Sequence, residues 1–183
     1  MSHRERLLLV VVGPPGTGKS TLSREFAKRH DYALVEEDNF VFTMNPASKI
    51  KRIARRQDIA LGAKNMLAVI NDYAEVGKNI LVSGAFVDGP LRLHEFDEWA
   101  VKANYRFIPV VLTASEIVRR KRQKTRGYVL PRALDRQLVK KSKRLKYAEQ
   151  SYVLNTSGMR RAESLKQLED TVILAKYFTK DTK

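Results

Sequence analysis

The sequence contains no cysteine among its 183 residues, which excludes disulfide bonds, thiolate metal sites and cysteine nucleophiles. It also has no apolar run long enough to cross a membrane, so we expect no membrane association. We expect no signal peptide, because the N-terminal residues lead directly into a glycine-rich stretch that cleavage would destroy. Together with a length suited to one well-buried domain, these absences predict a single cytoplasmic domain over residues 1–183.

Acidic residues are scarce: 20 Asp and Glu are outnumbered by 35 Lys and Arg, which gives a formal net charge of +15. The imbalance is localised, because residues 102–147 hold 15 basic residues and two acidic ones, a net charge of +13. A positive surface of this size attracts phosphates, either those of a nucleotide or those of a nucleic acid. A charge-rich solvated surface is the alternative interpretation.

The stretch from Leu7 to Ala27 reads LLLVVVGPPGTGKSTLSREFA and organises the chain. Its six leading apolar residues predict a strand buried on both faces of a parallel sheet, and residues 19–29 predict an amphipathic helix. Between them lies the pattern G-x-x-x-x-G-K-[ST], the phosphate-binding loop. The residues predicted to bind the nucleotide here are Gly13, Pro14, Pro15, Gly16, Thr17, Gly18, Lys19, Ser20 and Thr21.

Each part of the pattern has a physical role. The glycines let the backbone bend so that its N–H groups and the positive end of the following helix surround an anion. Lys19 is predicted to reach the outer phosphates, and the hydroxyl of Ser20 is predicted to bind Mg²⁺. The sequence therefore predicts a nucleotide-binding protein.

The rest of the chain alternates between strands and helices. Further strands are predicted at 32–35, 79–86, 105–113 and 152–155, and further helices at 58–76, 90–104, 115–127, 131–150 and 163–178. Residues 40–50 are predicted to form a loop, and Pro109 predicts an edge position or a bulge. The alternation predicts an α/β fold with a doubly wound five-stranded sheet.

This layout resembles the small P-loop kinases, the group that contains shikimate, gluconate and adenylylsulfate kinases. It is most similar to the polynucleotide kinase and zeta toxin-like kinases of the AAA_33 group. The resemblance covers nearly the whole chain and implies a P-loop NTPase fold. That fold has a parallel sheet with helices on both faces and an Arg-rich lid, here at about residues 119–150. It also implies an enzyme, a kinase that uses ATP and Mg²⁺ to phosphorylate an alcohol group of an acceptor.

The resemblance extends to further site residues. The family acid that closes the second strand falls on Asp38, which would accept the proton of the acceptor hydroxyl and help to hold the metal; Glu36 and Glu37 could share this role. Arg122 and Arg126 match the two lid arginines that stabilise the transferred phosphate. The turn that would hold the adenine comprises Asn155, Thr156 and Ser157.

One position departs from the family pattern. Ser83 stands where the third strand often ends in an aspartate that orders the water shell of Mg²⁺, and Asp88 is the nearest possible substitute. The loop text GPPGTGKS also occurs in large ring-forming ATPases, but those need an acidic pair closing the third strand and a helical lid domain. The chain has neither feature, so we expect a kinase instead.

Three functions stay open at this point. The first is a kinase acting on a small, anionic metabolite or nucleotide, with an acceptor site near the basic residues 49–56 and the turn after residue 86. The second is a kinase for the 5′-hydroxyl of a nucleic acid, which the basic surface favours. The third is a nucleotide-binding module without turnover, which Ser83 favours. ATP is expected over GTP, and both a monomer and a dimer are compatible with the sequence.

Overall fold

The computed structural model describes residues 5–41, 56–84, 90–146 and 151–177. Within these ranges no helix has the length and apolar character needed to span a bilayer. The elements, in chain order, are β1 (Arg6–Val12), α1 (Lys19–His30), β2 (Ala33–Glu36), α2 (Glu37–Val41), α4 (Arg56–Glu75), β3 (Ile80–Gly84), α5 (Pro90–Ala103), β4 (Tyr105–Thr113), α6 (Glu116–Thr125), α7 (Arg132–Lys146), β5 (Tyr152–Asn155) and α8 (Arg161–Tyr177).

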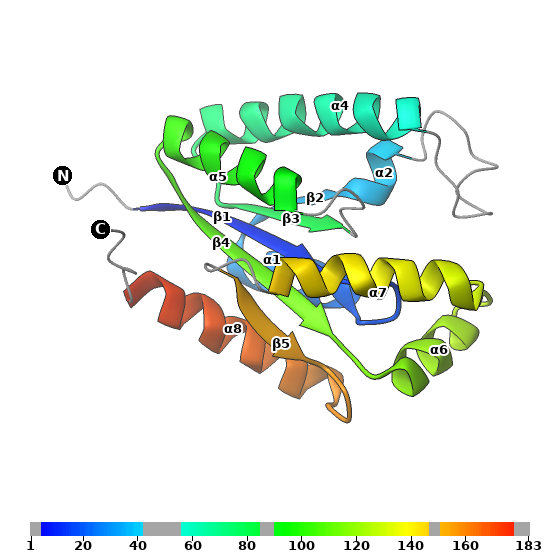
Figure 1. Cartoon of the computed structure of the whole chain (residues 1–183). Helices are drawn as coiled ribbons and strands as arrows, with labels where there is room; N and C mark the ends of the chain where they lie inside the picture. The colour runs from blue at the N-terminus through cyan, green and yellow to red at the C-terminus, as the bar shows by residue number, and fades with distance from the viewer. Residues whose placement is uncertain (1–4, 42–55, 85–89, 147–150, 178–183) are drawn as a thin grey trace.

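The strands of the described residues form one parallel sheet in the order β2-β3-β1-β4-β5. Parallel neighbours require crossover connections, which the helices supply, so the predicted doubly wound α/β arrangement is confirmed. Helices α1 and α8 cover one face of the sheet, and α4 and α5 cover the other (Figure 1). The carboxyl ends of the strands therefore meet at one edge, where ligands bind in folds of this kind.

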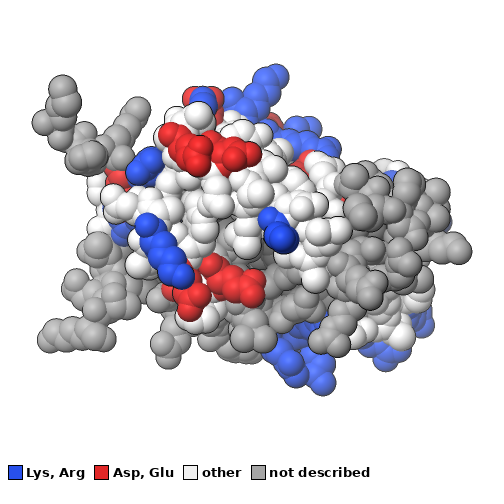
Figure 2. Space-filling model, turned by 90° about the horizontal axis from the view of Figure 1, so that it is seen from above, with Lys and Arg blue, Asp and Glu red and all other residues white. Residues whose placement is uncertain are grey.

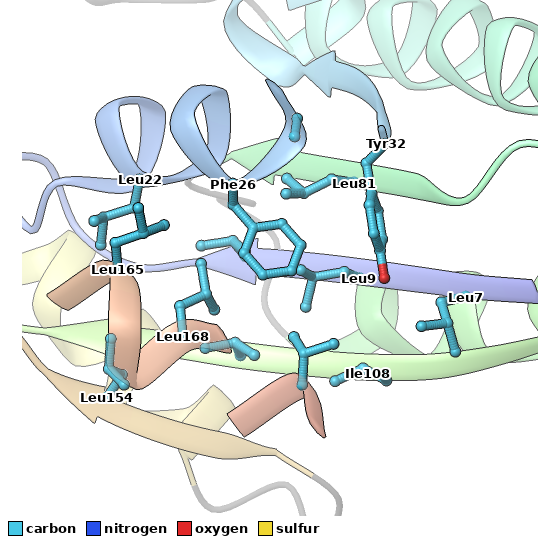
Figure 3. Packing of buried hydrophobic residues seen from close by; sticks show 14 of the residues in the cluster. Leu7, Leu9, Leu22, Phe26, Tyr32, Leu81, Ile108, Leu154, Leu165 and Leu168 are labelled. Atoms are coloured by element: carbon cyan, nitrogen blue, oxygen red, sulfur yellow. The ribbon is translucent and has the colours of Figure 1, made fainter. Parts of the chain in front are cut away.

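The side chains of β1 alternate between two buried clusters. Leu7, Leu9 and Val11 pack with α1 and α8, around Phe26 and Leu168 in Figure 3. The intervening residues of β1 pack with α4 and α5 on the other face. Every side chain from residue 7 to residue 12 is at most 2% exposed, which explains the uninterrupted apolar run in the sequence.

The prediction for Pro109 is confirmed in part, because the residue has an edge position on one side but the strand has no bulge there. β4 lies between β1 and β5 and is not an edge strand. Its register with β1 is unbroken from Tyr105 to Val111, so there is no bulge. Pro109 is tolerated because β5 begins opposite Val110, and at position 109 the strand therefore has no neighbour on the β5 side to demand an N–H.

The second strand also ends differently from the prediction. It spans Ala33–Glu36, and Glu37 begins the short helix α2, so Asp38 lies in the first turn of a helix and does not close the strand. The predicted loop at 40–50 is wrong at residues 40 and 41, which belong to α2, and the remainder lies outside the described residues. The other predicted bounds agree with the structure to within a few residues wherever it describes them.

Candidate functional site

The phosphate loop joins the end of β1 to the start of α1 at the carboxyl edge of the sheet. Gly16 has a φ of +88°, a conformation that side chains other than glycine rarely adopt. A Cβ atom at this position would lie 2.6 Å from the carbonyl oxygen of Arg119 in α6. A Cβ at Gly13 would lie 2.4 Å from the carbonyl oxygen of Leu112 in β4. The glycines therefore let the loop pack directly against the backbone of its neighbours.

The N-terminus of α1 is left without a side-chain cap. Gly18 occupies the cap position, no side chain accepts a hydrogen bond there, and the first turn holds no acidic residue. The first helical backbone bond runs from the N–H of Leu22 to the carbonyl of Gly18, so the preceding N–H groups have no acceptor within the helix. Such groups, together with the helix dipole, favour a bound anion.

Lys19 and Thr17 both donate to the carbonyl oxygen of Pro14. The distances are 3.3 Å from Nζ of Lys19 and 2.9 Å from Oγ1 of Thr17. These bonds hold the lysine ammonium over the loop, on the same side as the uncapped helix N-terminus. The loop therefore concentrates positive charge where phosphates are expected.

Arg122 is brought onto this loop from α6, as the resemblance implied for a lid arginine. Its Nη1 donates to the carbonyl oxygens of Gly16 (3.3 Å) and Thr17 (3.4 Å). The guanidinium also contacts Thr156, both at Oγ1 (3.0 Å from Nη1) and at the carbonyl oxygen (3.0 Å from Nη2). Four neutral acceptors thus fix the guanidinium between the phosphate loop and the turn after β5.

Arg126 lies one helical turn further on and donates from Nη2 to the hydroxyl of Thr21, at 3.1 Å. Burial, and secondly the nearby charge of Arg126, lower the pKa of the Arg122 guanidinium. In the described part of the chain, neither arginine has a carboxylate within ion-pair distance. Two neighbouring cations without a counter-charge at a phosphate loop form a site suited to an anion.

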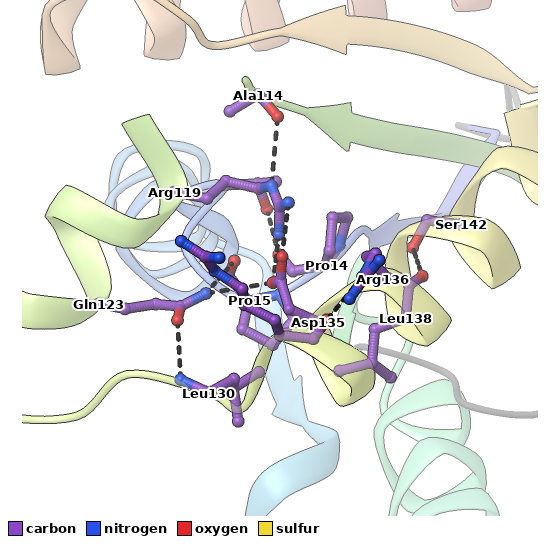
Figure 4. A network of polar contacts seen from close by, with 12 residues as sticks. Pro14, Pro15, Ala114, Arg119, Gln123, Leu130, Asp135, Arg136, Leu138 and Ser142 are labelled. Carbon is purple, nitrogen blue, oxygen red and sulfur yellow. Dashed lines mark hydrogen bonds and ion pairs between the residues drawn. The ribbon is translucent and has the colours of Figure 1, made fainter. Parts of the chain in front are cut away.

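A second network, built on Arg119, holds α6 and α7 together (Figure 4). The Arg119 guanidinium makes two bonds to the carboxylate of Asp135, at 2.5 and 2.8 Å, and a third to the carbonyl of Ala114, at 3.2 Å. Gln123 donates to the carbonyl oxygen of Pro15 (3.1 Å) and accepts from the N–H of Leu130 (3.1 Å). The lid helices are therefore attached to the phosphate loop by buried polar contacts.

Arg122 and Arg126 were selected from the sequence, whereas Arg119, Gln123 and Asp135 were missed. One feature of the sequence could have identified Asp135. Asp135 is one of only two acidic residues in the strongly basic segment 102–147, and it is 2% exposed. A lone carboxylate at a helical position among many bases is a candidate for a buried ion pair.

The turn after β5 is brought to the loop, as expected. The hydroxyl of Thr156 contacts the carbonyl oxygens of Thr17 (2.9 Å) and Thr113 (3.2 Å), and its side chain is buried. Ser157 accepts a hydrogen bond from the N–H of Ser115 at 2.7 Å, and Asn155 accepts one from the N–H of Ser157 at 3.0 Å. These contacts fix the turn beside the phosphate loop, and the predicted contact with adenine stays a prediction.

Strand register places the acidic residues of β2 and α2 at the level of the loop. Glu36 pairs with Ser83, which pairs with Val11, two residues before the loop begins. With strands about 4.8 Å apart, β2 lies about 10 Å from β1 across β3. Asp38, at the start of α2, is therefore at the same edge of the sheet as the phosphate loop.

Glu36 lies beside Ser83, the position where the family pattern often has an aspartate. Residues in register point to the same face, so Glu36 and Ser83 both face α1, and Arg24 of α1 binds Glu36 at 2.7 and 3.0 Å. In the described residues no three His, Asp or Glu side chains form a metal-binding group. Magnesium commonly binds through one or two protein oxygens plus substrate phosphates, and the hydroxyl of Ser20 is an oxygen ligand of the kind it takes. Residue 88 and the basic cluster 49–55 lie outside the described residues.

Known protein families and solved structures are similar to this chain in sequence pattern and fold. The family model described as an AAA domain (AAA_33) matches residues 8–147. A gluconokinase from Sinorhizobium meliloti 1021 is 22% identical with a TM-score of 0.66, over 96% of this chain and 97% of that chain. A shikimate kinase from Bacteroides thetaiotaomicron is 16% identical with a TM-score of 0.63, over 91% of this chain and 98% of that chain.

A chain of the Pnkp1/Rnl/Hen1 RNA repair complex is 20% identical with a TM-score of 0.65, over 79% of this chain and 46% of that chain. At these identities, structural similarity shows the fold alone. No curated protein matches the chain. Because the family model covers more than half of the sequence, the chain belongs to the AAA_33 family and has the fold of the small P-loop kinases.

Proposed function

We propose that this protein is a kinase that transfers the γ-phosphate of ATP to a hydroxyl group of an anionic metabolite or nucleotide. The observation that carries the proposal is the position of Arg122, whose guanidinium is held against Gly16 and Thr17 without a carboxylate partner in the described residues. Arg119 is neutralised by Asp135, whereas in the described residues no carboxylate neutralises the positive charge of Arg122 beside the loop.

The phosphate loop supplies the binding part of the mechanism. Its N–H groups and the N-terminus of α1 would hold the β- and γ-phosphates, and Lys19 would reach the outer oxygens. Ser20 and Asp38, which lies in the first turn of α2, would hold Mg²⁺. When bound, Mg²⁺ would neutralise charge on the phosphates.

The transfer step requires a base and a positive environment. The oxygen of the acceptor hydroxyl would form a bond to the γ-phosphorus, while the bond from that phosphorus to the bridging oxygen of ADP breaks. Asp38 would accept the proton that the hydroxyl loses. Arg122 and Arg126 would stabilise the charge on the transferred group. The lid helices α6 and α7, which are attached to the loop, would help to exclude water from the reaction.

A binding module without turnover is the second candidate, and Ser83 is the observation that favours it. The side chain is 4% exposed, faces α1 and brings no charge to the position where an acid was expected. The neighbouring acid, Glu36, is bound by Arg24. Such a protein would bind ATP through the same loop and would release no ADP.

Release of ADP from MgATP distinguishes the two candidates. The acceptor panel comprises sugar acids, nucleosides, nucleotides and 5′-hydroxyl RNA and DNA oligonucleotides, and the variants are Lys19→Ala and Asp38→Asn. Lys28→Ala is the matched control, because Lys28 is an exposed lysine of the same helix. We expect turnover with one acceptor class, reduced about 100-fold or more by either site variant. Tight ATP binding with no ADP release for any acceptor would contradict the kinase.

A further inference from the structure

Helix α7 presents a row of positively charged side chains to solvent. At about 100° per residue, its members lie within roughly 120° of arc on the surface, turned away from the buried Asp135 and Ser142. With a rise of 1.5 Å per residue, the row is about 18 Å long. We call it the α7 row, and its members, all exposed, are Arg132, Arg136, Lys140, Lys143 and Arg144.

Five bases without an acidic partner follow one another along one face of α7. Some exposed bases elsewhere are paired, as in Arg24–Glu36, Arg29–Glu169 and Lys78–Asp31. Across the described part of the chain, no carboxylate lies within ion-pair distance of any member of the row. Like charges spaced four residues apart on a helix repel each other, so the row lowers stability unless an anion is bound.

The face of the molecule on the side of α4 and α5 lacks this segregation of charge. Figure 2 views the molecule from the side of α4 and α5, and acidic and basic side chains there are interspersed over a largely uncharged surface. Figure 1 shows that α7 begins beside α6, at the carboxyl edge of the sheet, and runs back across the sheet from there. The row therefore extends from the edge that holds the phosphate loop.

The geometry of the row selects the kind of partner. A helix that lies on a membrane needs an exposed apolar face, whereas the face of α7 opposite the row is packed inside the protein around Asp135 and Ser142. An acidic protein surface offers scattered carboxylates, whereas four members of the row, at positions 132, 136, 140 and 144, recur about every 6 Å along the helix. A linear series of cations matches a linear series of phosphates.

We propose that the α7 row binds the sugar–phosphate backbone of a single-stranded nucleic acid. The row itself contains no aromatic residue, and the described aromatic residue nearest to it along the chain is Tyr128. We therefore expect base stacking to contribute little and the binding to be independent of nucleotide sequence. Binding through phosphates releases counterions and therefore weakens steeply as salt is added. This inference concerns binding and does not depend on phosphoryl transfer.

The test measures fluorescence anisotropy of a labelled 20-nucleotide single-stranded RNA without ATP, between 50 and 200 mM NaCl. The variant R136Q/K140Q/K143Q removes three members of the row. The control K28Q/K64Q/K102Q removes three exposed lysines from other helices and leaves the same net charge. If each of the five row members contacts one phosphate, the wild type should lose about 100-fold in affinity over this salt range. The triple variant keeps two members of the row and should lose about 7-fold.

We expect the control to keep the wild-type salt dependence. Equal loss of affinity in both triple variants would overturn the proposal, because it would show an effect of net charge alone. Absence of RNA binding by the wild type at 50 mM NaCl would also overturn it, as would tighter row-dependent binding to phosphatidylserine vesicles or polyglutamate. Circular dichroism checks folding, and the double variant K140Q/R144Q repeats the test if the triple variant unfolds. Since no turnover is measured, failure here leaves the proposed kinase activity untouched.

Discussion

Arg119 of α6 and Asp135 of α7 form a buried bidentate ion pair, with side chains 4% and 2% exposed and distances of 2.5 and 2.8 Å. The backbone of Arg119 also packs against Gly16 of the phosphate loop. The pair therefore joins the two lid helices at the point where they meet the loop. Its geometry makes α6, which carries Arg122, part of a fixed framework.

Asp135→Asn should destabilise the protein strongly. The substitution keeps the shape of the side chain but leaves the Arg119 guanidinium buried without a counter-charge, which costs about 3–5 kcal/mol in comparable cases. Urea unfolding measures the loss. Lys78→Gln, at the exposed pair with Asp31, is the control and should cost less than about 1 kcal/mol.

The double variant R119M/D135L provides a second check. Because it removes both charges and fills the site with apolar atoms, it should be more stable than Asp135→Asn. If Asp135→Asn alone has the stability of the wild type, the pair does not hold the two helices together.

Gly16→Ala should disrupt the contact between the loop and α6. The new Cβ would lie 2.6 Å from the carbonyl oxygen of Arg119, and the φ of +88° would be strained. Gly77→Ala is the matched control, because Gly77 has a similar φ of +73° with open space around it. The control should cost about 1–2 kcal/mol in unfolding free energy, from backbone strain alone.

We expect Gly16→Ala to lose clearly more stability than the control and to bind ATP at least 10-fold more weakly. Thermal unfolding and isothermal titration calorimetry measure the two effects. Equal loss of stability in the two variants would show that α6 adjusts freely to the added methyl group.

Much of the fold follows from local sequence. The run from Leu7 to Val12, the glycine pattern and the alternation of strands and helices are each encoded within short stretches. They predicted the sheet, its strands and the loop because burial on both faces demands continuous apolar runs. The position of Arg122 was predicted only by resemblance, since the sequence gives no physical reason to select it from its basic neighbours.

Features that depend on contacts distant in sequence were not predictable. Asp135 was counted as one more charge in a basic segment, because its partner, 16 residues away, is identified only when both helices are in place. Pro109 indicated an edge position or a bulge without deciding between them, because the edge position depends on where β5 begins, 43 residues later. Asp38 was assigned to a strand end because α2 is too short to produce a helical pattern.

Arg122→Lys should reduce turnover if the proposed kinase activity is correct. Lysine keeps the charge but cannot contact Gly16, Thr17 and Thr156 at the same time, because it lacks the planar fork. Arginines that stabilise phosphoryl transfer contribute about 10³-fold or more to kcat. We therefore expect kcat to fall by roughly that factor in the ADP-release assay, with a smaller change in KM for ATP.

The matched control for Arg122 lies on the same helix. Lys124→Ala removes an exposed cation of α6 that makes no contact with the loop in the described structure, and it should leave kcat within about 2-fold of the wild type. A fall in kcat of the same size in both variants would indicate a general effect of charge on the lid.

Tyr32 makes stability depend on pH in the alkaline range. Its hydroxyl lies among the buried leucines of Figure 3 and has no hydrogen-bond partner in the described residues. Burial raises the pKa of Tyr32 to about 12, above the value near 10 expected for the unfolded chain. The neutral phenol therefore favours the folded state, and this contribution is complete below pH 10 and lost as the pH rises from 10 to 12.

Tyr32→Phe removes both the unpartnered hydroxyl and its titration. We expect the unfolding free energy at pH 7 to rise by about 1 kcal/mol, and the loss of stability between pH 10 and 12 to become smaller. Tyr105→Phe should change the unfolding free energy in the opposite direction. The hydroxyl of Tyr105 donates to the carbonyl oxygen of Lys78 at 2.7 Å, so its removal should cost about 1 kcal/mol. Urea unfolding at pH 7, 10 and 11 measures both variants. If Tyr32→Phe destabilises the protein as Tyr105→Phe does, the Tyr32 hydroxyl has a partner in solution and the predicted alkaline transition belongs to other groups.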